Sequence, residues 1–178
     1  MENIFNQKKD HSVFSWDMLG DIKEGRGSLG LEMPVLVYRL MQFTLYDVLS
    51  KKLGRQQADI ILRDAGFLAG CEFAKNSLNL NLELNYFIAS LQEAMANLKI
   101  GILRIESSNE DASSIILTVA EDLDCSGLPL TEETICTYDE GFISGILETY
   151  TGNSYSVKEI DCWASGDRIC RFKCSVQK

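Results

Sequence analysis

Four side chains in the C-terminal third of the chain could together bind a metal ion: Cys136, Glu159, Cys162 and Cys170. The last two flank Ser165-Gly166-Asp167, a turn signal between two apolar, β-prone stretches, which predicts a β-hairpin. A three-residue loop centred on the glycine places the two cysteines opposite each other, with Cβ atoms about 4.5–5.5 Å apart. Two thiolates at that spacing can hold one Zn²⁺, and Cys136 and Glu159 could complete a tetrahedron.

The spacing alone leaves two interpretations of these residues open. Glu159 and Cys162 are three residues apart, and in a regular strand they point to opposite faces. Both reach one metal only if the strand bulges, twists strongly or ends near Cys162. Cysteines on a hairpin can instead be small buried hydrophobic residues. Cys136 favours the metal interpretation, because it precedes an expected helix whose dipole stabilises a thiolate.

The remaining candidate residues for chemistry are few. Cys174 shares strand parity with Cys170 and is a spare metal ligand, whereas Cys125, in a loop beside Ser126-Gly127, could be a reactive thiol. The single histidine, His11, lies in the polar N-terminal segment, so an Asp-His-nucleophile device is nearly excluded. The sequence therefore favours a binding protein over an enzyme.

Composition and charge exclude other function classes. The net charge of −9, with no run of Lys and Arg longer than two, argues against nucleic acid or an anionic membrane as a partner. No segment approaches the ~18 apolar residues of a membrane-spanning helix, and the polar N-terminus lacks the apolar core of a secretory signal. We therefore expect a cytoplasmic protein, in which the six cysteines are thiols or metal ligands rather than disulfides.

Hydrophobic periodicity and turn signals predict an α+β fold, in which an antiparallel sheet carries about four helices. Residues 1–33 form an N-terminal extension with a short strand or hairpin in its second half, and residues 34–178 form one domain. The expected helices cover about residues 34–53, 56–77, 84–98 and 134–151. The expected strands cover about residues 100–107, 113–120, 155–163 and 169–176.

Several motifs in the C-terminal half resemble the 4-vinyl reductase domain family. They are Cys136, the helix segment Gly141-Phe142-Ile143-Ser144-Gly145, the strand Glu159-Ile160-Asp161-Cys162, the turn Gly166-Asp167 and the end Cys170-Arg171-Phe172. They occur in the family's order and cover about residues 125–174; the preceding helices fit the family layout without diagnostic motifs.

The resemblance implies a fold shared by hydrocarbon-sensing domains and vesicle-tethering subunits. In phenol- and xylene-responsive bacterial activators, such a domain binds an aromatic effector and holds Zn²⁺ by Cys, Glu, Cys and Cys. These ligands map here onto Cys136, Glu159, Cys162 and Cys170. Such a set leaves no open position, so the zinc is expected to be structural. The chain lacks the histidine that those relatives place at the phenol, so an apolar ligand is accommodated more easily than a phenolic hydroxyl.

The leading hypothesis is a stand-alone sensor or carrier that binds a small apolar or aromatic molecule between the helices and the sheet. It would act as a homodimer, through the N-terminal segment and helices, and could signal to a downstream protein. The alternatives are an enzyme or carrier of tetrapyrrole metabolism and a ligand-free interaction subunit like the tethering relatives. Each aromatic pocket candidate could also be plain core packing; the candidates are Phe67, Phe73, Tyr86, Phe87 and Phe142.

Overall fold

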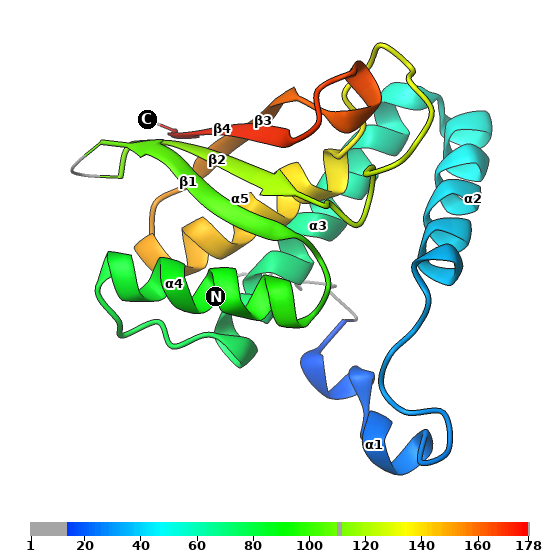
Figure 1. Cartoon of the computed structure of the whole chain (residues 1–178), viewed down its shortest axis with the longest axis horizontal. Coiled ribbons are helices and arrows are strands. Elements are labelled where there is room, and N and C mark those ends of the chain that lie inside the picture. Colours follow the sequence, from blue (N-terminus) through cyan, green and yellow to red (C-terminus); the bar gives the residue numbers. More distant parts are fainter. Residues whose placement is uncertain (1–13, 110–111, 178) are drawn as a thin grey trace, which may run out of the picture. The chain divides into compact units, whose positions relative to one another are not determined.

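The computed structural model describes residues 14–109 and 112–177 of the chain (Figure 1). The chain divides into two compact units, Met1–Glu32 and Met33–Lys178. In the first unit, a 3₁₀ helix η1 (Trp16–Leu19) precedes one helical turn, α1 (Ile22–Gly25). The strand or hairpin expected here is therefore wrong for the described residues. The backbone turns into a helix instead because Asp21 caps it, accepting a hydrogen bond from the Glu24 amide at 3.0 Å.

The second unit contains four helices near the expected positions. They are α2 (Val35–Leu53), α3 (Arg55–Ser77), α4 (Leu84–Asn97) and α5 (Thr137–Thr151). Gly54, with φ at +86°, joins α2 to α3, where a side chain would strain the backbone. Helix α5 begins slightly later than expected, because Cys136 is its N-cap residue and the segment before it is not helical.

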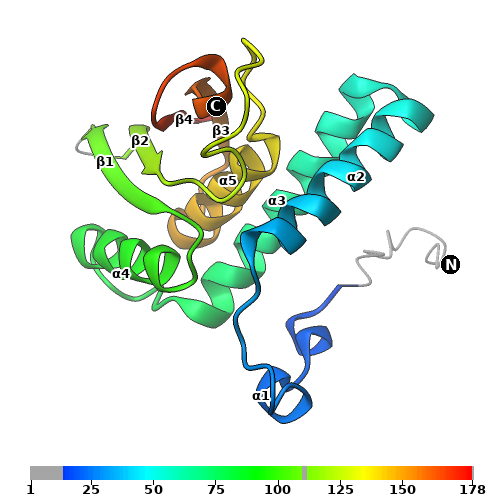
Figure 2. The same ribbon diagram turned by 45° about the vertical axis from the view of Figure 1, so that its right-hand side comes forward.

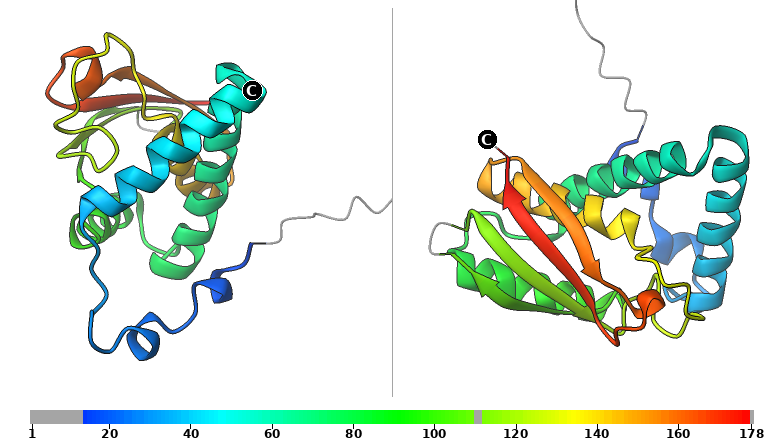
Figure 3. Two further views of the ribbon diagram at one scale, coloured as in Figure 1. Left: turned by 90° about the vertical axis from the view of Figure 1, so that its right-hand side faces the viewer. Right: turned by 90° about the horizontal axis from the view of Figure 1, so that it is seen from above.

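Four antiparallel strands form one sheet in the order β1-β2-β4-β3. They are β1 (Ile102–Ser108), β2 (Ser114–Ala120), β3 (Tyr155–Asp161) and β4 (Cys170–Val176). One face of the sheet is covered by α4 and α5, and no helix of the described residues covers the opposite face (Figure 3). The predicted α+β fold with an antiparallel sheet is thus confirmed.

Helices α3 and α5 pack backbone to backbone on the side of α5 away from the sheet (Figure 1). Glycines make this approach close: Gly66 and Gly70 on α3 meet Gly141 and Gly145 on α5. A Cβ added at any of the four would overlap a backbone carbonyl oxygen of the other helix. The small residues of both helices therefore fix α5, and with it the position of Cys136, relative to α3.

Helix α2 lies alongside α3 on the outside of the unit and contributes no buried residue (Figure 2). Many of its apolar side chains are exposed, among them Leu36 (75 %) and Leu40 (63 %). Among the residues that the structure describes, no helix is long and apolar enough to cross a membrane.

Candidate metal centre and ligand cavities

Four cysteines from four different segments converge at one end of the sheet. Cys125 lies in the loop after β2, Cys136 caps α5, Cys162 follows β3 and Cys170 begins β4. Their sulfur atoms all lie within 4.8 Å of one another. All four side chains are buried, and all are free thiols. The structure thus brings three of the four predicted ligands together and adds Cys125, which sequence reasoning had treated only as a reactive thiol.

The sulfur spacing fits tetrahedral zinc. The Sγ atom of Cys136 lies 3.8 Å from that of Cys162 and 3.9 Å from that of Cys170. Four sulfurs about 2.3 Å from a central Zn²⁺ are about 3.8 Å apart, so these two distances match such a site. Cys125 and Cys170 are closer, at 3.1 Å. The donor set, four buried thiols without a disulfide among them, therefore suits a soft cation such as Zn²⁺.

The strand geometry that separates Glu159 from Cys162 is irregular in the way that a shared site requires. Glu159 pairs with Phe172 and Asp161 with Arg171, so the register shifts by one residue between them. Strand β3 then ends, and the 3₁₀ helix η2 (Trp163–Ser165) follows. The bulge turns Glu159 and Cys162 toward the same side, although the loop between the two cysteines is longer than the three residues expected.

The Glu159 carboxylate lies beside the thiols but outside the group of four. Its Oε2 atom accepts a hydrogen bond from the Cys136 amide at 2.9 Å. Its Oε1 atom is buried and has no hydrogen-bond partner among the described residues. Burial raises the pKa of Glu159 to about 8. A buried, unpartnered oxygen at this place is a further donor available to a cation.

The thiols influence each other's ionisation strongly. Hydrogen bonds from Cys125, then from Cys136 and Cys170, lower the pKa of Cys162. The same network, led by the contact with Cys125, raises the pKa of Cys136. Cys174 lies outside the cluster, and burial alone raises its pKa to about 12. The cluster therefore favours one thiolate, at Cys162, and a cation would be needed to favour more.

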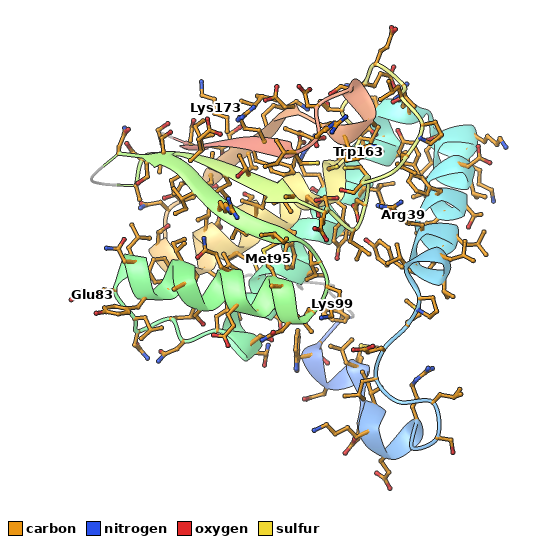
Figure 4. All side chains as sticks on the ribbon, in the orientation of Figure 1. Arg39, Glu83, Met95, Lys99, Trp163 and Lys173 are labelled. Atoms are coloured by element: carbon orange, nitrogen blue, oxygen red, sulfur yellow. The ribbon has the colours of Figure 1, made fainter. Side chains whose placement is uncertain are left out.

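The loop that carries Cys125 is anchored by α2. Arg39 donates hydrogen bonds to the carbonyl oxygens of Leu123 at 2.8 Å and Ser126 at 2.9 Å, and Figure 4 shows its side chain directed at this loop. The Tyr38 hydroxyl donates to Asp124 Oδ1 at 2.8 Å. These contacts, made by residues far from Cys125 in the sequence, hold its thiol at the cluster.

The predicted aromatic pocket residues do not converge on one space. Phe73 and Phe142 are in contact, with ring centroids 5.4 Å apart, and Phe87 stacks on Tyr150 at 3.8 Å. Tyr86 is 67 % exposed. Phe67 lines a surface groove between α3, α5 and β3. Between α4, the sheet and α5, where the ligand was expected, there is a cavity of about 10 Å³.

A larger cavity, of about 390 Å³, lies between α2, α3 and the segment 128–137 that leads into α5. Sequence reasoning did not anticipate it, because its walls come from three segments that no motif connects. Its lining is mixed apolar and polar; the residues are Gln42, Phe43, Tyr46, Arg55, Asp59, Leu62, Arg63, Leu128, Pro129, Thr131, Thr134, Ile135, Thr137 and Lys158.

The C-terminal part of the chain matches a known domain family: residues 115–175 match the vinyl-4-reductase domain. The resemblance to the 4-vinyl reductase domain family is thereby confirmed. An uncharacterized protein of Methanocaldococcus jannaschii is 24 % identical over 108 residues, which are 61 % of this chain. The match likewise spans 61 % of that relative's length.

Solved structures share the fold at low sequence identity. The phenol-responsive sensory domain of the transcription activator PoxR superposes with a TM-score of 0.63 at 13 % identity, covering 83 % of this chain and 76 % of that one. A vinyl-4-reductase family protein from Methanocaldococcus jannaschii has a TM-score of 0.63 at 17 % identity, covering 93 % and 99 %. These likenesses establish the common fold.

Proposed function

We propose that this chain is a small-molecule-binding domain, acting as a sensor or carrier, in which a zinc–thiolate centre is structural. The observation that carries the proposal is the convergence of four buried thiols beside a buried carboxylate, in a fold shared with a phenol-responsive sensory domain. Nearly complete burial of the four cysteines leaves no space at the centre for a substrate.

Zinc would be held by Cys136, Cys162 and Cys170, with a fourth donor from Cys125 or Glu159. The sulfur group favours Cys125, whereas the unpartnered Oε1 atom keeps Glu159 available. With four protein donors, the ion supplies no catalytic chemistry and instead ties together β3, β4 and the start of α5. Zn²⁺ would also favour the thiolate form at every cysteine that it contacts.

The ligand proposed from the sequence is a small apolar or aromatic molecule. Phe87, Phe142 and their neighbours form an apolar layer between the helices and the sheet, where the present cavity of about 10 Å³ admits no more than a water-sized guest. Binding there would require the Phe87–Tyr150 stack to open. That requirement favours a sensor, because a ligand that selects an open state shifts the population of the domain.

The exposed apolar residues of α2 support a homodimer. Contiguous apolar surface of this kind is typical of a protein interface. A dimer built on α2 would place the interface next to the Cys125 loop, since Arg39 of α2 holds that loop. A ligand-induced change could then pass to a downstream signalling protein.

One observation favours a second candidate function, an interaction subunit without a ligand: the small volume of the cavity beneath the sheet. A thermal-shift screen of small aromatic and isoprenoid-like compounds separates the two. A sensor is expected to melt at a higher temperature with at least one compound, by about 2.7 kcal/mol of stabilisation at a hundredfold excess over Kd.

The Phe87→Ala variant should lose most of that shift, because Phe87 lies in the proposed pocket. Tyr86→Ala is the matched control, since its exposed ring neighbours Phe87 on the same helix. No stabilising compound, or equal shifts in both variants, would favour the interaction subunit.

A further inference from the structure

The cavity between α2, α3 and segment 128–137 has the size and walls of a preformed small-molecule site. Its volume of about 390 Å³ lies in the range typical of such pockets, about 300–1,000 Å³. Phe43, Leu62, Leu128 and Ile135 supply apolar walls from three separate segments. The ring of Phe87, on α4, is not part of this lining, so the cavity is separate from the aromatic core pocket.

The charged side chains of this cavity are mostly basic, in a chain whose net charge is −9. Arg55, Arg63 and Lys158 line it, and among the described residues of the lining they face a single carboxylate, Asp59. Asp59 already accepts a hydrogen bond from the Tyr46 hydroxyl at 2.7 Å. The cavity therefore selects for an anion over a cation.

Two of the three basic groups are held by a buried partner. Arg63 Nη2 lies 2.6 Å and Lys158 Nζ 2.8 Å from the carboxylate of Glu140, which is only 2 % exposed. Removing either cation would leave a buried charge poorly compensated, so this pair of contacts is structural. Arg55 is consequently the cation available to a ligand.

Arg55 is bound instead to an exposed carboxylate of the adjoining segment. Both Nη atoms of Arg55 contact Glu133, and the two side chains are 59 % and 51 % exposed. An ion pair this exposed contributes about 0–1 kcal/mol and is readily exchanged. Glu132, the preceding residue, has φ at +60°, an uncommon conformation for a residue with a side chain. Segment 128–137 thus presents Glu133 to Arg55 across the mouth of an apolar cavity.

We propose that this cavity binds an apolar molecule bearing one carboxylate, and that Glu133 occupies the place of that carboxylate on Arg55. The ligand's carboxylate would take over the two-pronged contact with the guanidinium, and its apolar body would lie against Phe43, Leu62 and Ile135. Glu133 then acts as an internal competitor that lowers affinity without closing the cavity.

Isothermal titration calorimetry with 4-phenylbutyrate tests this site, with 4-phenylbutan-1-ol as the uncharged counterpart. The acid should bind and the alcohol should bind at least about tenfold more weakly, because a charge-assisted hydrogen bond is lost. Decanoate, run in parallel, distinguishes a straight apolar chain from a ring. Binding of either acid with the pattern below supports the proposal; binding of neither acid to the parent protein overturns it.

Two variants should move the affinity in opposite directions. Arg55→Gln should weaken acid binding about tenfold, whereas Glu133→Gln should tighten it by up to about fivefold, because the competitor is removed. Lys51→Gln and Asp47→Asn are the matched controls, since this exposed pair on α2 makes the same charge changes outside the cavity. Phe87→Ala, in the separate core pocket, should leave the affinity unchanged. Equal affinities of the Arg55→Gln variant and the parent, or equal affinities for acid and alcohol, would overturn the proposal.

Discussion

At the residue scale, the proposed metal centre has more donors than a tetrahedral ion needs. Cys125, Cys136, Cys162 and Cys170 form the sulfur group, and Glu159 adds an unpartnered buried oxygen beside it. A fifth donor can only take a place in the tetrahedron if another leaves it. The roles of Cys125 and Glu159 are therefore the sharpest question about this site.

Replacing Cys162 should damage folding before any other property. Zinc and its thiolates come together only in the folded chain, so their binding free energy stabilises the fold. We expect Cys162→Ser to lose zinc and to lower Tm by about 10 °C or more, a fall of roughly 2–4 kcal/mol in stability. Differential scanning fluorimetry and elemental analysis measure both. Cys71→Ser, which alters a half-buried thiol outside the cluster, is the control; a Cys162→Ser protein that retains zinc and parental Tm would refute the assignment.

The fourth zinc ligand can be identified by comparing two variants. If Cys125 is the ligand, Cys125→Ser should weaken zinc binding strongly in a competition with a chromogenic chelator, while Glu159→Gln should change it little. The reverse order would assign Glu159, as the family resemblance implies. Because Glu159 also accepts the amide hydrogen bond of Cys136, its glutamine variant retains an oxygen acceptor and tests the charge alone.

At the element scale, α3 and α5 are fixed by glycines rather than by large side chains. We expect Gly145→Ala to destabilise the protein by about 1–3 kcal/mol, because the added Cβ overlaps the Phe67 carbonyl oxygen. Urea denaturation measures the loss. Gly25→Ala, where an added Cβ meets nothing within 4 Å, should not destabilise the protein. Equal stability of the Gly145→Ala protein and the parent would mean that the helices can separate freely.

The same scale shows why parts of the fold could be predicted and others could not. Apolar periodicity located α2, α3 and α4 closely, since each forms a long, regular pattern. The glycine-rich residues 14–33 carry no comparable pattern, and a single capping contact by Asp21 selects a helical turn there.

For the candidate site, local spacing pointed to Cys162 and Cys170 because both lie on one hairpin. Cys125 carries no such signal. Its position depends on Tyr38 and Arg39 of α2, which hold the loop from more than eighty residues away in the sequence.

At the scale of the whole molecule, α2 exposes more apolar surface than an isolated chain benefits from. We therefore expect a homodimer, and expect the double variant Leu36→Glu with Leu40→Glu to be monomeric, because two charges would be buried in the interface. Light scattering coupled to size-exclusion chromatography measures the mass. Leu98→Glu is the control, since Leu98 is an exposed leucine outside α2. A parent protein that is monomeric at high concentration would contradict this prediction.

The central claim is that the buried cysteines form a structural zinc centre. Native mass spectrometry of protein purified under reducing conditions, without chelator or added metal, tests it most directly. The account predicts one zinc ion per chain, together with the oligomeric mass and any co-purified ligand, and loss of that zinc only on denaturation. A fully reduced, folded chain whose mass contains no metal would contradict it.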